Sequence, residues 1–213
     1  MTLRLRFRRW LGAQVRQSRA YLNEVAVIGH EDREALGFSS FGQGSAIMAP
    51  QGVMYNTEHI RVGTGVLIGP NVSLSVGITV GQEMIDSPVV KIGSRTVVGR
   101  GTHIVGHWDI EIGDDVLIGP NVYITDQNHT YENPNTPIAA QPGIEAAVSI
   151  GSGSWLATNV VILPGTRIGE NTVVAAGAVV RGEFPSHVVL AGVPARIVKA
   201  RSGAGTWQKF GKE

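Results

Sequence analysis

The sequence predicts an all-β solenoid whose chain runs through three short sides in each turn. Three observations predict it. Val, Ile or Leu recurs at every sixth position over most of residues 62–180 of the 213-residue chain, and Gly, Ala or Ser follows at most of these positions. The chain also has 28 Gly, no Cys and only 16% charged residues, a composition that suits an extensive buried surface.

The six-residue period fits neither a helix nor an ordinary strand, which repeat at about 3.6 and 2 residues. In a three-sided solenoid, each side places one large apolar residue inside, and a small residue lets the chain turn the corner. Successive turns stack their strands ~4.8 Å apart and form three parallel sheets around a dry core. Asp86 is the one exception among 17 frame positions: Val62, Ile68, Leu74, Val80, Asp86, Ile92, Val98, Ile104, then after a shift of two Ile112, Ile118, Ile124, and finally Ile150, Leu156, Ile162, Ile168, Val174, Val180.

The solenoid is expected over residues 61–200, between less regular ends. Residues 1–25 predict an amphipathic helix with Leu3, Phe7, Trp10, Leu11 and Val15 on one stripe. Residues 26–60 read as an irregular approach segment, and residues 201–213 as a polar tail. Because no apolar run reaches the ~18 residues of a membrane span and no secretory signal or Cys is present, a cytoplasmic protein is expected.

The repeats stop between Ile124 and Ile150, where about 20 extra residues intervene by the count of repeats. Three prolines in this stretch are poor continuations of a strand, which predicts one long loop extruded from the coil over about residues 128–147. Loops of this length inside compact domains are usually functional or disordered. The sequence "TDQNHTY" at the start of the interruption is not of low complexity, which favours function.

The segments "IGSGSWLATNVVILPGTRIGENTVVAAGAVV" and "VVLAGVPARIVKA" resemble the hexapeptide-repeat acyltransferases, in particular the maltose and galactoside O-acetyltransferases. The resemblance covers roughly residues 60–200. It implies a left-handed parallel β-helix and a homotrimer with its sites between subunits. It also implies an enzyme that moves an acetyl group from acetyl-CoA, as co-substrate and without a metal, to a hydroxyl of a sugar, glycan or glycolipid.

His129 is the predicted catalytic residue. In the resembling branch the catalytic histidine stands just ahead of the loop, and an ungapped alignment from "IGDDVLIGPNV" places His129 there. Transfer from a thioester to an alcohol needs a base that is neutral at pH 7, and histidine, with a pKa of about 6.5, suits it. Asp126 and Asn128 are candidates to orient the ring or support the loop; Asp126 reads equally well as a turn residue that ends the strand.

The resemblance also implies a coenzyme A groove between two subunits. The cationic side chains among the matching positions would pair with the phosphates of coenzyme A. The alternative is that these side chains are only solvated cations on a terminal segment. No Walker or dinucleotide motif is present. The matching positions are Trp155, Thr158, Ala176, Arg181, Gly182, Arg196 and Lys199.

The acceptor side departs from the galactoside branch, because two acceptor-contacting positions fall on Gly99 and His107. A galactoside pocket is therefore not expected. His107, Trp108 and Tyr131 are the predicted acceptor-binding residues, since an aromatic side chain beside polar groups suits a sugar. The alternatives are that His107 and Trp108 are corner residues of the coil and that Tyr131 packs the loop.

Two other functions compete with acetyl transfer. His103, His107 and His129 are candidates for a zinc site of the kind found in γ-type carbonic anhydrases. A non-catalytic scaffold is the other alternative.

The first 19 residues hold six Arg and no acid, whereas the remaining 194 carry 12 basic and 17 acidic residues. The basic helix suits either an anionic membrane, at its inner face, or packing on the coil or a neighbouring subunit. Nucleic acid is not expected, because the body is acidic and contains no recognition motif.

Overall fold

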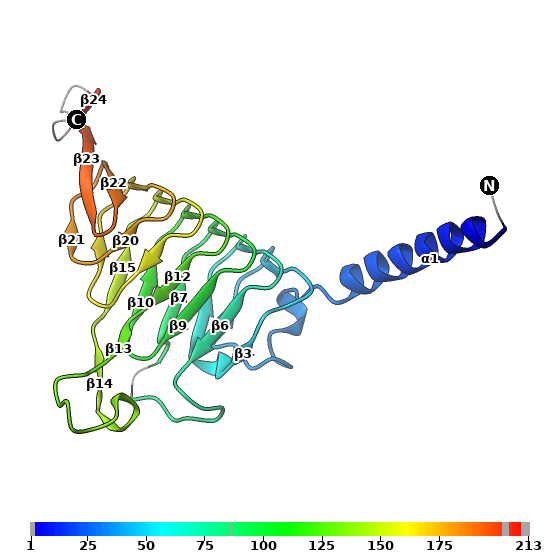
Figure 1. Ribbon diagram of the computed structural model, residues 1–213, viewed down its shortest axis with the longest axis horizontal. Helices are drawn as coiled ribbons and strands as arrows, with labels where there is room; N and C mark the ends of the chain where they lie inside the picture. Colours follow the sequence, from blue (N-terminus) through cyan, green and yellow to red (C-terminus); the bar gives the residue numbers. More distant parts are fainter. Residues whose placement is uncertain (1–2, 86, 202–204, 210–213) are drawn as a thin grey trace.

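The computed structural model describes residues 3–85, 87–201 and 205–209. Its body is a coil of short parallel strands that pass in turn through three sheets (Figure 1). The first sheet contains β1 (Ser40–Phe41), β4 (Ile60–Val62), β7 (Val90–Ile92), β10 (Ile110–Ile112), β15 (Val148–Ile150), β18 (Arg167–Ile168) and β21 (Glu183–Phe184).

The second sheet follows the first along each turn, and the third sheet completes the turn. The second contains β2 (Ala46–Ile47), β5 (Leu67–Ile68), β8 (Val97–Val98), β11 (Leu117–Ile118), β16 (Trp155–Leu156), β19 (Val173–Val174), β22 (Val188–Gly192), β23 (Ala195–Arg201) and β24 (Trp207–Lys209). The third contains β3 (Met54–Tyr55), β6 (Ser73–Val76), β9 (His103–Gly106), β12 (Tyr123–Thr125), β17 (Val161–Ile162) and β20 (Val179–Val180).

The interior consists of the apolar residues of the six-residue period, stacked in register from turn to turn. In the second sheet Ile118 pairs with Val98 on one side and Leu156 on the other, and all three side chains are buried. The corners stack as tightly: a Cβ on Gly93 would lie 2.4 Å from the carbonyl carbon of Gly113 in the next turn. The prediction of an all-β fold with parallel sheets is confirmed.

The coil begins earlier than predicted. Residues 26–60 were expected to be irregular, yet β1, β2 and β3 lie within them and pair in parallel with β4, β5 and β6. Phe41 and Ile47, six positions apart, are buried in the core. The regular frame was hidden because Met54 is the residue of this turn that pairs with Leu74, so that seven positions separate Ile47 from Met54 and eight separate Met54 from Val62.

A second extruded segment was also missed. Val80 and Asp86 were expected to continue the period, but Val80 is 81% exposed and Asp86 lies outside the described residues. Leu74 on β6 and Ile92 on β7 occupy adjacent sides of the coil, so residues 77–85 form a loop outside it, and the chain is back in the core at Val89. Because the extra chain is a multiple of six residues long, the period resumes in phase and conceals the insertion.

Helix α1 (Leu3–Val25) projects away from the coil (Figure 1). It joins the coil through a bridge between Ile28 and Ile47 and a hydrogen bond from Gln51 Nε2 to the Ala26 carbonyl oxygen. Within the described residues, no helix has both the length and the apolar character needed to cross a membrane. The predicted terminal tail is partly ordered, since β24 pairs with β23; residues 202–204 and 210–213 lie outside the described residues.

Candidate functional site

The predicted loop leaves the coil as an antiparallel hairpin, which we call the extruded hairpin (residues 127–145). It consists of β13 (Gln127–His129), a tip containing the short 3-10 helix η3 (Ile138–Ala140), and β14 (Gly143–Glu145). Thr130 Oγ1 donates a hydrogen bond to the Pro142 carbonyl oxygen, and the Gln141 side chain bonds the backbone of Asn133 and Thr136. These bonds fix the loop that carries His129.

The hairpin register determines which side chains share a face. Gln127 pairs with Glu145 and His129 pairs with Gly143, so these four lie on one face, while Asn128 and Ile144 lie on the other. His129 is exposed. His129 lies two residues along the strand from Gln127, the partner of Glu145, and this spacing corresponds to about 7 Å between the two positions. The predicted base therefore projects on the same face as Glu145.

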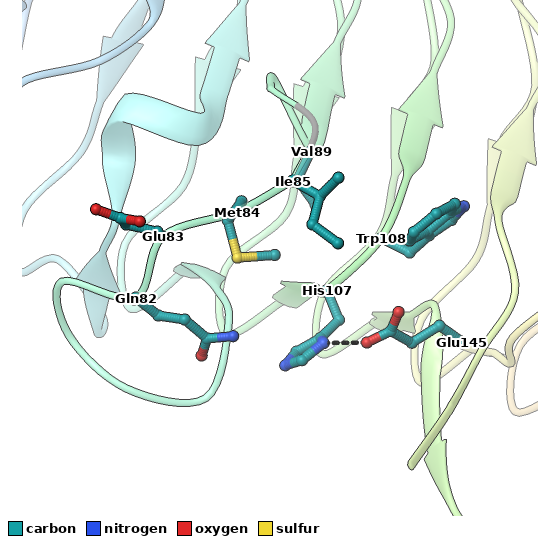
Figure 2. A pocket seen from close by; sticks show the side chains of 8 residues that line it. All are labelled: Gln82, Glu83, Met84, Ile85, Val89, His107, Trp108 and Glu145. Atoms are coloured by element: carbon teal, nitrogen blue, oxygen red, sulfur yellow. Dashed lines mark hydrogen bonds and ion pairs between the residues drawn. The ribbon is translucent and has the colours of Figure 1, made fainter. Parts of the chain in front are cut away.

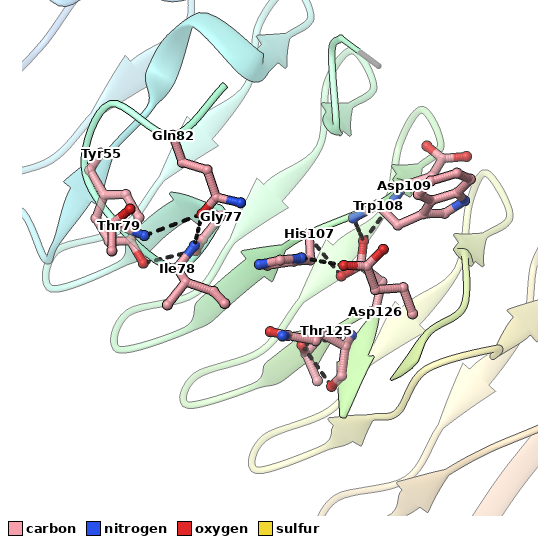
Figure 3. Close-up of polar contacts among 12 residues, drawn as sticks. Tyr55, Gly77, Ile78, Thr79, Gln82, His107, Trp108, Asp109, Thr125 and Asp126 are labelled. Carbon is pink, nitrogen blue, oxygen red and sulfur yellow. Dashed lines mark hydrogen bonds and ion pairs between the residues drawn. The ribbon is translucent and has the colours of Figure 1, made fainter. Parts of the chain in front are cut away.

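Asp126 is fully buried, and its carboxylate serves the coil (Figure 3). Oδ1 accepts from the backbone N–H of His107 at 2.8 Å, and Oδ2 accepts from those of Trp108 and Asp109 at 2.8 and 2.7 Å. These bonds satisfy the backbone N–H groups of the corner between Ile104 and Ile112, where the six-residue period is lengthened by two residues. The prediction that Asp126 orients His129 is therefore corrected in favour of the turn role, because its oxygens are engaged with these amides.

Asn128 also does not orient the histidine ring. Its Oδ1 accepts a hydrogen bond from the backbone N–H of His129 at 2.9 Å, so it supports the strand rather than the imidazole. Its side chain faces a small pocket of about 90 Å³ that Arg181, Ile144 and Leu163 also line.

His107 is hydrogen-bonded through Nδ1 to Oε1 of Glu145 on the extruded hairpin (Figure 2). The His107 side chain is 10% exposed, and its Nε2 is buried without a hydrogen-bond partner among the described residues. Buried polar atoms in folded proteins nearly always have a partner. The Nε2 atom is therefore available to a water molecule or to a polar group of a bound molecule.

This side chain lines a pocket of about 160 Å³ between the coil and both extruded segments, which we call the acceptor pocket. Trp108 is 45% exposed at its edge. His107 and Trp108, which the sequence predicted to bind the acceptor, both line this pocket. The remaining lining residues are Gln82, Glu83, Met84, Ile85, Val89 and Glu145 (Figure 2).

The loop of residues 77–85 is tied to the coil by the amide side chain of Asn56 and braced internally by that of Gln82. Asn56 Nδ2 donates to the carbonyl oxygens of Val76 and Thr79, and its Oδ1 accepts from Gly81 N–H. Gln82 Oε1 accepts from Ile78 N–H at 2.8 Å (Figure 3). Sequence reasoning missed this wall of the pocket and also Glu145. The failure of the period at Asp86 and the adjoining Ser-Pro pair were the available signals.

Tyr131 does not reach the acceptor pocket. It lies near the tip of the extruded hairpin and is 69% exposed, and the pocket is lined by other residues. The prediction that Tyr131 contacts the acceptor is therefore not supported within one chain, because the tip leads away from the coil (Figure 1).

The residues predicted to bind coenzyme A lie on separate parts of one chain. Thr158 and Ala176 stack in successive turns at the corner between the second and third sheets, beside Trp155 on β16. Arg181 and Gly182 lie at the corner between the third and first sheets, and Arg196 and Lys199 lie on β23. A single chain does not gather them into one pocket.

The three histidines of the zinc alternative lie on different elements and have different contacts. His103 is exposed on β9, His107 is bonded to Glu145, and His129 is on the hairpin. In the part of the chain that the structure describes, no group of three His, Cys, Asp or Glu side chains is placed to hold a metal ion.

Comparison with known proteins agrees with the repeats. Residues 147–182 match the family model for the bacterial transferase hexapeptide, and residues 89–126 match that for the hexapeptide repeat of succinyl-transferase. An Escherichia coli protein named as the lipopolysaccharide biosynthesis O-acetyl transferase WbbJ is 36% identical over 148 residues, which cover 66% of this chain and 74% of that protein. The galactoside O-acetyltransferase of Escherichia coli is 35% identical over 57% of this chain and 63% of its own length.

Among solved structures, a variant of the N-acyltransferase AntD of Bacillus cereus in complex with dTDP and coenzyme A superposes with a TM-score of 0.69. It covers 84% of this chain and 92% of that one at 22% identity, which is a likeness of fold. The repeats, the two matching family models and the identity to WbbJ over most of its length agree, and the chain therefore belongs to the hexapeptide-repeat family of acyltransferase enzymes.

Proposed function

We propose that the protein transfers an acetyl group from acetyl-CoA to a hydroxyl of a sugar, glycan or glycolipid, with His129 as the general base. The observation that carries the proposal is the shared face of the extruded hairpin. On this face, the exposed imidazole of His129 lies about 7 Å along the strand from the paired residues Gln127 and Glu145. Glu145 in turn bonds His107, which lines the acceptor pocket. The coil is proposed to be left-handed, as in the family that the sequence resembles.

In the proposed reaction, a neutral His129 nitrogen accepts the proton of the acceptor hydroxyl as its oxygen attacks the thioester carbonyl carbon. The C–O bond forms, and the carbonyl oxygen carries the negative charge of the tetrahedral intermediate, which a backbone N–H of the loop stabilises. When the C–S bond breaks, the imidazolium returns the proton to the departing thiolate. The acetyl ester and the free thiol are the products, and the histidine ends neutral.

The acceptor pocket supports a carbohydrate as the acceptor. Its volume of about 160 Å³ is of the size of one sugar ring. A sugar hydroxyl would satisfy His107 Nε2, and the exposed indole of Trp108 offers the apolar face of a ring a surface to stack on. O-acetyltransferases of lipopolysaccharide and galactosides among the relatives are consistent with this class of acceptor.

The scattered coenzyme residues support a homotrimer with sites between subunits. Thr158 and Arg181 lie at opposite edges of the third sheet, so a coenzyme A that uses both positions is best placed between two copies. Among the described residues, none hydrogen-bonds the His129 ring, and a neighbouring copy would also be able to supply that contact.

The decisive experiment is a screen of acyl donors and sugar acceptors with mass detection, run on the full chain. A mass increase of one acetyl group on a carbohydrate hydroxyl supports the proposal. Light scattering on the same sample should give three times the 22.6 kDa chain mass. Failure to bind coenzyme A at millimolar concentration contradicts acetyl transfer, and stoichiometric zinc in the purified protein contradicts it in favour of the metalloenzyme alternative.

A further inference from the structure

Helix α1 leaves an apolar face without a partner. Phe7, Trp10 and Leu11 are 59, 57 and 45% exposed, and the Phe7 and Trp10 ring centroids are 6.0 Å apart. At 3.6 residues per turn, most of its apolar side chains fall within an arc of about 140°, and Leu5 lies outside that arc. The others on this arc are similarly exposed: Val15, Tyr21, Leu22 and Val25.

The rest of the helix surface is cationic. Its 23 residues contain six Arg, and Glu24 in the last turn is the single acid. At 3.6 residues per turn, Arg8 and Arg19 lie along one edge of the apolar arc and Arg6 along the other. Arg9 and Arg16 lie on the opposite face, and Arg4 falls within the arc. Apolar residues facing one way with cations along the edges are the pattern of helices that lie in the plane of a membrane surface.

We propose that α1 binds the surface of an anionic lipid membrane and so holds the coil beside it. The charge pattern selects this occupant. A second copy of α1 would bring two sets of six Arg together, and nucleic acid would leave the aromatic side chains in water. Among the described residues, the coil does not cover the helix, and the chain that follows α1 meets the coil through the Ile28–Ile47 bridge and the bond from Gln51 to the Ala26 carbonyl oxygen (Figure 1).

The attachment suits this role, because the last turn of α1 is continuous with chain that is fixed to the first turn of the coil. Gln51 Nε2 bonds the Ala26 carbonyl oxygen at 2.6 Å, and Ile28 and Ile47 exchange two backbone hydrogen bonds. A membrane-bound α1 therefore holds the N-terminal end of the coil near the lipid. The inference is independent of the proposed acetyl transfer.

The test is sedimentation of the full-length protein with vesicles of phosphatidylcholine alone and with vesicles in which about a third of the lipid is phosphatidylglycerol. We expect binding to the anionic vesicles that weakens in high salt. The pair Phe7→Gln and Trp10→Gln should lower the partition coefficient by about tenfold or more. Replacing Arg8 and Arg19 with Gln should lower it by about fivefold for each charge removed.

The matched control is the pair Ala13→Gln and Ala20→Gln, which changes the same number of residues on the polar face without altering charge. It should change partitioning by less than about twofold. The proposal would be overturned if the Ala13, Ala20 pair lowered the partition coefficient as much as the Phe7, Trp10 pair, or if both kinds of vesicle bound equally. Self-association that depends on the helix, without lipid binding, would also overturn it. Turnover of a water-soluble acceptor, measured on the Phe7→Gln, Trp10→Gln protein, separates membrane binding from catalysis, and it should not change.

Discussion

The imidazole of His107 and the carboxylate of Glu145 connect the coil to the extruded hairpin through a hydrogen bond between residues 38 positions apart. The bond fixes the ring with Nδ1 toward the hairpin and the buried Nε2 without a protein partner. A hydrogen bond to an ionised group is stronger than one between neutral groups. The shape of the acceptor pocket therefore depends on the position of the hairpin that also carries His129.

Replacing Glu145 with Gln should weaken acceptor binding. The amide keeps the size of the side chain but loses the charge that holds the imidazole, so we expect the acceptor KM to rise about three- to tenfold. The KM for acetyl-CoA should stay the same. Steady-state kinetics with each substrate varied would measure both, and Glu132→Gln, on the exposed tip of the hairpin, is the control. An unchanged acceptor KM would contradict the assigned pocket.

His129→Ala should remove the general base and leave binding intact. We expect kcat to fall by about 10²–10⁴ with little change in the KM for acetyl-CoA. His103→Ala, which removes another exposed imidazole on β9, should retain kcat. If the His129 variant turns over at the original rate, the residue has no part in the mechanism.

Asp126→Asn should destabilise the fold. The buried carboxylate accepts three backbone N–H bonds, and an amide that has a single oxygen leaves part of this corner unsatisfied. A buried unsatisfied group costs about 1–3 kcal/mol in the free energy of unfolding. Denaturant unfolding would measure the loss. Asp115→Asn breaks an exposed ion pair with Arg95 and should change stability less; an equal loss in both variants would argue against the role of the corner.

The stability difference between the unsubstituted protein and Asp126→Asn should depend on pH. Burial raises the pKa of Asp126 above its usual value of 3.8, against the lowering effect of the Trp108, His107 and Asp109 N–H groups. With a raised pKa, the folded state binds more protons than the unfolded state between the two pKa values, so stability decreases as pH rises through that window. The difference in the free energy of unfolding between the unsubstituted protein and Asp126→Asn should therefore be larger near pH 4 than at neutrality. Unfolding titrations at both pH values test the sign, and an advantage that grows with pH would refute it.

Gly93→Ala should disturb the stacking of turns. The added methyl would lie 2.4 Å from the Gly113 backbone, which cannot move without shifting the next corner, and overpacking of this kind costs about 1–3 kcal/mol. Gly143→Ala is the control, because its nearest new contact is the flexible end of Gln127 at 3.2 Å. Thermal unfolding should show a fall in Tm for the first variant only, and equal Tm values would contradict tight corner packing.

Part of the candidate site could be predicted from the sequence. The interruption after Ile124 located the extruded hairpin, and His107 and Trp108, which were predicted to bind the acceptor, both line the pocket. Glu145 was not found, since its partner is 38 positions away and no local pattern records that contact. Asp126 was left with two roles because a carboxylate at the end of a strand suits either a turn or a histidine, and the choice depends on which donors surround it.

The sequence by itself determined the three-sided coil, because a strict six-residue period in apolar and small residues leaves few other ways to bury those side chains. It also determined that the chain is interrupted near His129. The tertiary structure decided the rest: that residues 77–85 leave the coil although the period runs through them, that Glu145 meets His107, and that the described part of the coil leaves α1 uncovered. The physical reason is that burial is periodic along the chain, whereas contacts between loops depend on where the stacked turns bring their corners.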